Sequence, residues 1–129
     1  MRLWLNRPRG REESLPFDAP QFAVHECGFL PEGMADWNYS SLNSPFWRLY
    51  HNGADGCWIE SGPGRWPLNP EHIVLIPANL TFNCRSAHNA PHLWLHFSVL
   101  PEYAFRGTHP FALPVSTVAQ EHLRQFVTL

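Results

Sequence analysis

The feature that most limits how this chain can fold is the frequent interruption of short apolar runs by turn-forming residues. Thirteen Pro and eight Gly are distributed over 129 residues, and few long stretches suited to a helix remain. Between the turns, runs rich in β-branched and aromatic residues fall near 21–27, 46–52, 57–61, 72–76, 80–85 and 91–99. Strands of this length and spacing predict an all-β body, either a jelly roll or a small antiparallel barrel.

Composition and charge narrow the class of protein further. With 44% hydrophobic and 16% charged residues, the chain suits one globular domain. The formal net charge is -2, and all nine basic residues are Arg. Because a nucleic-acid surface needs a basic stripe that attracts phosphates, the composition argues against direct DNA binding by this chain.

The sequence also indicates a cytoplasmic protein with no membrane partner. No apolar run approaches the roughly 20 residues that cross a bilayer as a helix. Residues 1–9 are too charged and too interrupted by Pro for a signal peptide. Cys27, Cys57 and Cys84 lie far apart in the chain and cannot all pair, which indicates reduced thiols.

Three segments of the chain differ in character. Residues 1–20 are polar and Pro-rich, and we expect them to form a flexible N-terminal arm. Residues 21–113 are the β-rich body. Residues 114–129 change to a helical pattern, in which Ser116 or Thr117 can cap the helix.

The predicted C-terminal helix has an apolar stripe at helical spacing, formed by Val118, His122, Phe126 and Leu129. Such a stripe either packs on the barrel of the same domain or pairs with a second copy of the helix in a homodimer. The sequence leaves both possibilities open. Because the pattern meets no terminating signal, we expect the helix to continue in a longer protein.

The run at 91–99 alternates, which assigns its side chains to two faces of a strand. One face carries polar and aromatic side chains and the other carries apolar ones, namely His92, Trp94, His96 and Ser98 against Leu93, Leu95, Phe97 and Val99. An apolar row suits packing against another layer. We therefore expect the face with the histidines and the tryptophan to line a cavity.

In the segment 66–79, an aromatic and an aliphatic residue lead to Pro, and after two spacer residues four aliphatic residues end at Pro77. This order resembles the second half of the cupin barrel in the N-terminal sensor domains of AraC-family transcriptional regulators. The similarity extends to 44–53 before this segment and to 92–97 after it. It covers roughly residues 22–100.

The resemblance implies a cupin-like double-stranded β-helix, or jelly-roll barrel, that senses a small-molecule effector, often a sugar. It implies no enzymatic activity and no cofactor, and it implies a linker helix that makes homodimer contacts. DNA would be bound only by a separate C-terminal helix-turn-helix domain. We expect that domain to be absent from residues 1–129.

The alternation and the resemblance together suggest which residues bind the effector. In sugar-sensing relatives, the strand at 91–99 supplies a His and a Trp two residues apart, as His92 and Trp94 are in this chain. Arg48 is expected to point inward, because the aligned cupin strand turns a metal ligand inward. A sugar stacks on Trp while Arg, His and Asn hold its hydroxyl groups, and plain core packing is the alternative role. The predicted effector-binding residues are His92, Trp94, Arg48, Tyr50, His96, Phe82, Cys84 and Phe46.

A metal-dependent cupin enzyme, such as an isomerase or dioxygenase, is the alternative function. His92 and His96 have the spacing that binds zinc on a helix, but on a strand they lie about 13 Å apart along the chain. Phe82 occupies the position of the last ligand in metal-binding cupins. The acidic residues are scattered among turns and suggest no catalytic set, so we predict neither a metal site nor catalytic residues. A secreted carbohydrate-binding module is disfavoured by the missing signal peptide.

Overall fold

The computed structural model describes residues 21–33, 36–101 and 106–128, so the predicted N-terminal arm at 1–20 lies outside the described residues. The described chain forms nine strands followed by one helix. These elements are β1 (Gln21–Leu30), β2 (Tyr39–Leu42), β3 (Trp47–Asn52), β4 (Cys57–Ser61), β5 (Gly64–Leu68), β6 (His72–Ile76), β7 (Phe82–Ser86), β8 (His92–Leu100), β9 (Phe111–Pro114) and α1 (Thr117–Val127).

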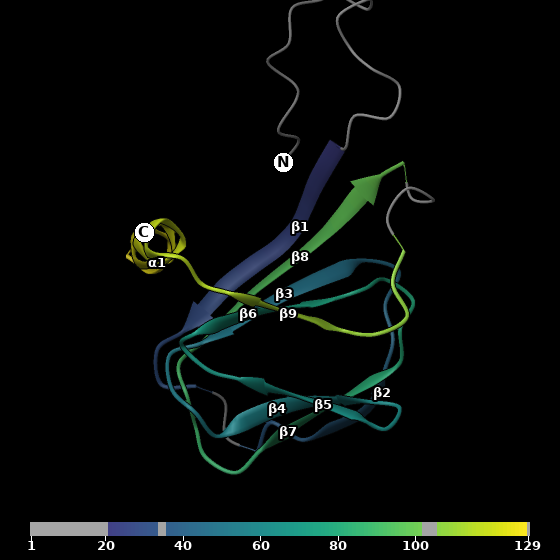
Figure 1. Ribbon diagram of the computed structural model, residues 1–129, viewed down its shortest axis with the longest axis horizontal. Helices are drawn as coiled ribbons and strands as arrows, with labels where there is room; N and C mark the ends of the chain where they lie inside the picture. Colours follow the sequence, from purple (N-terminus) through teal and green to yellow (C-terminus); the bar gives the residue numbers. More distant parts are fainter. Residues whose placement is uncertain (1–20, 34–35, 102–105, 129) are drawn as a thin grey trace, which may run out of the picture.

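The strands form two antiparallel sheets that face each other (Figure 1). One sheet, which we name sheet A, has five strands in the order β1-β8-β3-β6-β9. The other, sheet B, has four strands in the order β2-β7-β4-β5. The chain passes repeatedly from one sheet to the other, as in a jelly roll. The predicted all-β, jelly-roll-like class with a C-terminal helix is therefore confirmed.

The strands that the sequence fails to predict all lie at sheet edges. The six predicted runs correspond to β1, β3, β4, β6, β7 and β8, whereas β2, β5 and β9 are missed. Strand β5 includes Pro67, and β9 ends at Pro114. Pro cannot donate a hydrogen bond to a neighbouring strand, so within sheets it occurs mainly on edge strands. Because Pro has a low strand propensity, these strands are not predicted from composition.

The connection between β4 and β5 depends on a glycine. Ser61 pairs with Gly64 across the hairpin, and only two residues join them. The first of these, Gly62, has a φ of +55°, a left-handed conformation that other residues adopt at a cost. The turn aligns β5 with β4 along the edge of sheet B.

Alternation along the strands divides sheet A into an inner face and an outer face. The inner face looks toward sheet B and forms the core with it. Ile59 of β4 and Val74 and Ile76 of β6 have no exposed surface in this core. The outer face carries a second apolar row, which includes Leu49 and Leu95 and lies toward α1.

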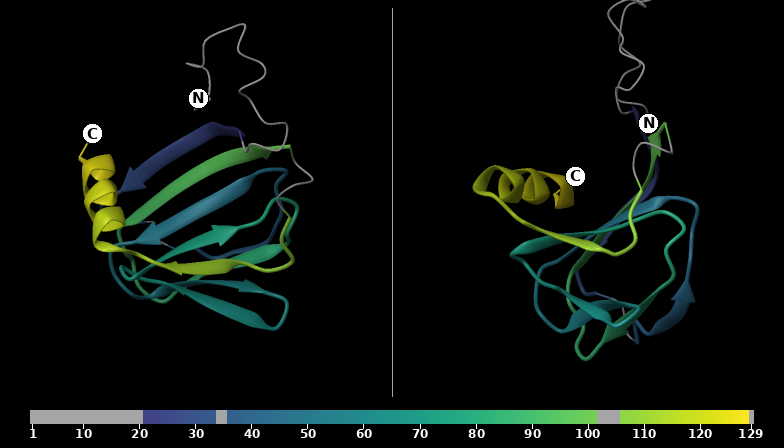
Figure 2. Two further views of the ribbon diagram at one scale, coloured as in Figure 1. Left: turned by 45° about the horizontal axis from the view of Figure 1, so that its top comes forward. Right: turned by 45° about the vertical axis from the view of Figure 1, so that its right-hand side comes forward.

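Helix α1 begins as the sequence predicts, and it lies beside sheet A rather than sheet B (Figure 2). The Ser116 side chain is the N-cap and accepts a hydrogen bond from the backbone N–H of Ala119 at 3.1 Å. The helix has 11 residues. Within the described residues, no helix combines the length and the apolar character needed to cross a membrane.

The face of α1 that meets the sheet differs from the predicted stripe. Val118 is 67% exposed and does not pack on the sheet. Ala119 and Leu123 instead share the sheet-facing side with His122 and Phe126, and Leu129 lies outside the described residues. Two of the four predicted stripe residues, His122 and Phe126, thus line the groove, whereas Val118 does not.

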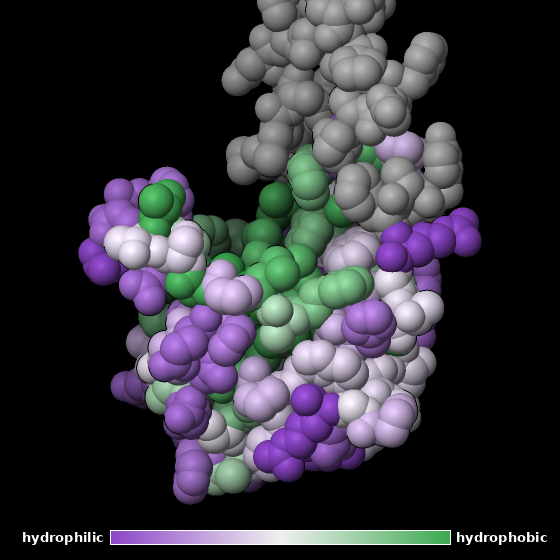
Figure 3. All heavy atoms as spheres, viewed as in Figure 1, coloured by the Kyte–Doolittle hydropathy of each residue, from purple (hydrophilic) through white to green (hydrophobic). Residues whose placement is uncertain are grey.

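An apolar groove of about 260 Å³ separates α1 from the outer face of sheet A. No described residue of α1 is buried. Figure 3 shows the apolar surface that gathers between the helix and the sheet. The groove is lined by Leu49, Ile73, Leu93, Leu95, Ala119, His122, Leu123 and Phe126.

Candidate functional site

Neighbouring strands β3 and β8 bring most of the predicted effector-binding residues together. In their antiparallel register, Arg48 lies opposite His96, and Tyr50 lies opposite Trp94. These side chains alternate with the outer apolar row, so they share the inner face of sheet A. Strand β7 of sheet B contributes Phe82 and Cys84 from the opposite side of the core.

At one end of this inner face the side chains are closely packed. The ring of His92 lies 4.9 Å from the ring of Trp37 and 4.9 Å from that of Tyr50, centroid to centroid. Its Nδ1 lies 2.7 Å from Oδ1 of Asn52, and because that oxygen only accepts, the imidazole donates. The adjoining hollow has a volume of about 10 Å³, room for about one water. We name this region, defined by Trp37, Tyr50, Asn52 and His92, the closed end.

Half of the predicted effector-binding residues are core side chains in this structure. His92, Tyr50, Phe82 and Cys84 are between 0% and 4% exposed. Their burial fits the alternative role of core packing. An effector would reach these four side chains only if the core around them rearranged, so an effector contact at these residues stays a prediction.

The other four predicted residues are only partly buried: Trp94 adjoins the closed end, opposite Tyr50, and Arg48 and His96 lie further along β3 and β8. We name this region, defined by Phe46, Arg48, Trp94 and His96, the open end. The rings of Phe46 and His96 lie 4.7 Å apart, centroid to centroid. All four side chains keep some contact with solvent.

Arg48 points inward, as the sequence predicts, and its guanidinium is held among polar and aromatic groups. Nη1 donates to the Tyr50 hydroxyl at 2.9 Å, and Nη2 donates to Oγ of Ser44 at 2.6 Å. The guanidinium carbon lies 5.2 Å from the ring centroid of Phe46 and 5.1 Å from that of Phe82. Nε is buried and has no hydrogen-bond partner among the described residues.

Glu26 of β1 belongs to the open end and was missed by the sequence analysis. Its Oε1 accepts a hydrogen bond from Nε1 of Trp94 at 3.3 Å, and its Oε2 lies 3.6 Å from Nδ1 of His96. Gly28, directly opposite Trp94, makes room for the indole, since a Cβ at that position would lie 2.3 Å from Cζ2 of Trp94. No sequence signal identifies Glu26, because its position depends on the pairing of β1 with β8.

Burial keeps the ionisable groups near Arg48 uncharged at neutral pH. It raises the pKa of Tyr50 to about 12 and that of Cys84 to about 12, so both stay protonated. Burial also lowers the pKa of His92 to about 4. The pKa of His96 is lowered mainly by burial and then by the charge of Arg48, with Glu26 opposing the shift.

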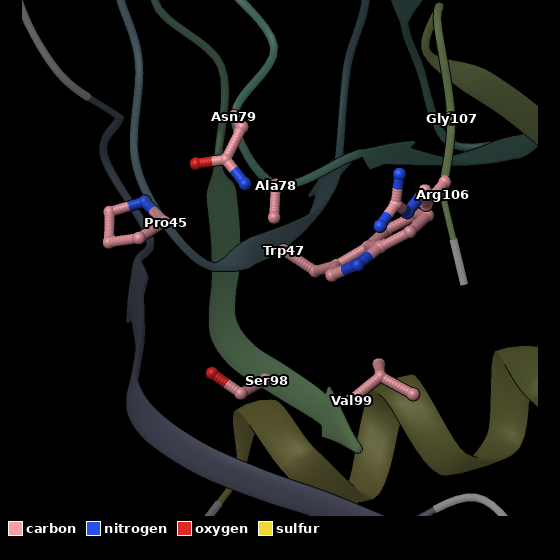
Figure 4. Close-up of a pocket in the computed structure, with 8 residues that line it drawn as sticks. All are labelled: Pro45, Trp47, Ala78, Asn79, Ser98, Val99, Arg106 and Gly107. Carbon is pink, nitrogen blue, oxygen red and sulfur yellow. The ribbon is translucent and has the colours of Figure 1, made fainter. Parts of the chain in front are cut away.

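A hollow of about 420 Å³ lies beyond the open end, where the strands of sheet A finish (Figure 4). None of the predicted effector-binding residues lines it. Alternation along the chain explains the separation: Pro45 and Trp47 face the hollow, whereas Phe46 and Arg48 face the open end. The hollow is lined by Pro45, Trp47, Ala78, Asn79, Ser98, Val99, Arg106 and Gly107.

Hydrogen bonds connect the wall of this hollow to the open end. Oγ of Ser98 lies 2.6 Å from Nε2 of His25, whose ring is 6.0 Å from that of Phe46. The backbone N–H of Asn79 donates to the carbonyl of Ser44 at 2.7 Å. Sequence reasoning could not find the hollow, because its walls come from four segments that are distant in the chain.

The described histidines, cysteines and acidic residues are dispersed over the molecule. Among residues 21–33, 36–101 and 106–128, no cluster of three or more His, Cys, Asp or Glu is placed to hold a metal ion. Cys57 and Cys84 are buried free thiols, and Cys27 is an exposed one.

Comparisons with known proteins add no family assignment. The sequence matches no protein-family model. No curated protein matches it significantly. The relationship to AraC-type sensor domains therefore stays a prediction that depends on the sequence resemblance.

Proposed function

We propose that this chain is the cytoplasmic effector-sensing domain of an AraC-type transcriptional regulator, and that it binds a sugar or sugar-derived molecule at the open end. The observation that carries the proposal is the composition of the open end. Trp94, His96 and Arg48 occupy inner-face positions where a plain core would hold aliphatic residues. A half-buried Trp with Arg and His beside it suits a sugar, whose apolar face stacks and whose hydroxyl groups need hydrogen-bond partners.

Strands β3 and β8 offer a direct connection between the open end and α1. Arg48 faces inward while its neighbour Leu49 faces the groove beneath α1, and Trp94 and Leu95 are related in the same way. Adjacent residues of one strand move together, so a ligand that displaces Arg48 or Trp94 displaces the surface beside α1. In the proposed regulator, this movement would change how α1 presents homodimer contacts and a C-terminal DNA-binding domain.

The test is a thermal-unfolding screen of the chain 1–129 with monosaccharides, uronic acids and divalent metals. A ligand that binds only the folded state raises the unfolding midpoint. We expect a sugar or a sugar acid to raise the midpoint of the wild type and to have no effect on Trp94→Ala. Trp58→Ala is the matched control, because Trp58 is also partly buried but lies on sheet B, where the guanidinium carbon of Arg65 is 3.9 Å from its ring centroid. The Trp58→Ala variant should retain the shift of the midpoint.

Two outcomes would contradict the proposal. A midpoint raised by metals alone would favour the metal-dependent cupin enzyme. A sugar-induced shift that persists in Trp94→Ala and disappears in Trp58→Ala would move the site away from the open end.

A further inference from the structure

Arg48 uses only part of its hydrogen-bonding capacity within the described residues, and one of its nitrogens, Nε, is buried. A guanidinium has five N–H donors. Arg48 uses two of them within the described residues, one to Tyr50 and one to Ser44. The Nε–H is buried and unpaired, although buried donors in proteins are nearly always paired.

The charge of Arg48 also lacks a partner. Two other arginines, Arg85 and Arg124, each form an ion pair with a glutamate. Arg48 has no carboxylate within 4.0 Å among the described residues. Its hydroxyl and thiol neighbours stay protonated, and the flanking aromatic rings attract a cation without supplying an anion. A cation that is partly removed from water is stabilised when an anion pairs with it.

Glu26 is an acidic group of the open end, and its carboxylate faces other partners. Its carboxylate contacts Nε1 of Trp94 and Nδ1 of His96. The Glu26 side chain is 62% exposed, so water screens its charge. It therefore leaves the guanidinium of Arg48 available to another anion.

We infer that the effector carries a carboxylate and that this carboxylate binds the guanidinium of Arg48. The inference deepens the proposed function and rests on it. A carboxylate suits this position because its two oxygens match the planar fork of a guanidinium and can accept from Nε and a terminal nitrogen at once. Trp94 and Phe46 would contact the remainder of the molecule. The effector class is then a sugar acid or a similar small organic acid rather than a neutral sugar.

The test compares an acid with its neutral amide on one carbon skeleton. The ¹⁵N-labelled chain 1–129 is titrated with glucuronate and with glucuronamide, by calorimetry and by NMR of the arginine Nε–H signals. Acetate serves as the minimal carboxylate probe in the same NMR experiment. The variants are Arg48→Met and Arg48→Lys, with Arg106→Met as the matched control because Arg106 lines the neighbouring hollow. Near-UV circular dichroism verifies that each variant is folded.

We expect glucuronate to bind the wild type at least about tenfold more tightly than glucuronamide, since a charge-assisted hydrogen bond is worth that much or more. The preference should disappear in Arg48→Met and decrease in Arg48→Lys, which keeps the charge but loses the fork. It should be unchanged in Arg106→Met. Acetate should shift the Nε–H signal of Arg48 more than that of exposed Arg65.

Three results would overturn the inference. Equal affinity for the acid and the amide would show that the effector needs no carboxylate, and the proposed sugar-sensing function would still stand. A preference lost in Arg106→Met and kept in Arg48→Met would place the acid in the neighbouring hollow. An Arg48 Nε–H signal that none of the three probes moves would show that the guanidinium is not available to a ligand.

Discussion

The closed end and the open end take most of their inner-face side chains from β3 and β8, yet those side chains differ in how deeply they are buried. At the closed end, Trp37 is 5% exposed and packs on the rings of Tyr50 and His92. At the open end, the Glu26 side chain beside Trp94 is 62% exposed. An inner-face polar residue is thus a core residue where another element covers it, and a candidate ligand contact where none does.

This difference also explains how the two histidines of β8 behave. His92 donates to Asn52 within a fully packed region, and its environment disfavours the charged form. His96 contacts Phe46 and lies near the Glu26 carboxylate, so burial disfavours its charged form while Glu26 favours it. The two ends can therefore be distinguished by stability, by pH dependence and by mutation.

The largest expected difference between the two ends is in the free energy of unfolding. Trp37→Ala removes a nearly fully buried ring, and we expect a loss of about 3–5 kcal/mol. Trp94→Ala removes a partly buried ring, and we expect a loss of about 1–2 kcal/mol. Urea denaturation followed by circular dichroism measures both losses. Equal losses would show that the open end is packed as tightly as the closed end.

The pH dependence of stability sharpens the comparison. Burial lowers the pKa of His92 to about 4 in the folded chain, from an ordinary value of 6.5. The unfolded chain thus binds more protons between these values, and the stabilisation present above pH 6.5 is lost as pH falls toward 4. The loss is on the order of 3 kcal/mol. Urea denaturation across this range should show a weaker pH dependence in His92→Gln than in the wild type, whereas His122→Gln on exposed α1 should match the wild type.

A substitution on β1 tests how tightly the Trp94 indole packs against Gly28. In Gly28→Ala, the new Cβ would lie 2.3 Å from Cζ2 of Trp94, so the indole must move. We expect a loss of about 1–3 kcal/mol in the free energy of unfolding. The loss should shrink when Gly28→Ala is made in the Trp94→Ala background, because the clash is then gone. An undiminished loss in the double variant would assign the cost to the backbone of β1.

The smallest expected effect is a shift in the pKa of His96, which reports the charges of the open end. Burial is the main cause of its lowered pKa, and the positive charge of Arg48 adds to it. Arg48→Met should therefore raise the pKa of His96, and Glu26→Gln should lower it further. An NMR titration of the imidazole signals measures both shifts. If neither variant changed the pKa of His96, the charges of Arg48 and Glu26 would have no measurable effect on this imidazole.

Part of this arrangement could be predicted from the sequence. Alternation along 91–99 correctly assigns His92, Trp94 and His96 to one face, because successive side chains of a strand point to opposite sides. The central strands were found because they are rich in β-branched and aromatic residues. The short edge strands were missed, since they contain Pro or polar residues and depend on a neighbouring strand for their conformation.

The inward direction of Arg48 was expected from the cupin resemblance, whereas the sequence by itself determined the strand periodicity and the start of α1 at Ser116 or Thr117. These properties depend on residues that are close in the chain. Tertiary structure alone decided that Trp37 closes one end, that Glu26 joins the other, and that a hollow opens beside Trp47. Each of these depends on which strands pair and on which side chains cover them, and those contacts join residues that are distant in the sequence.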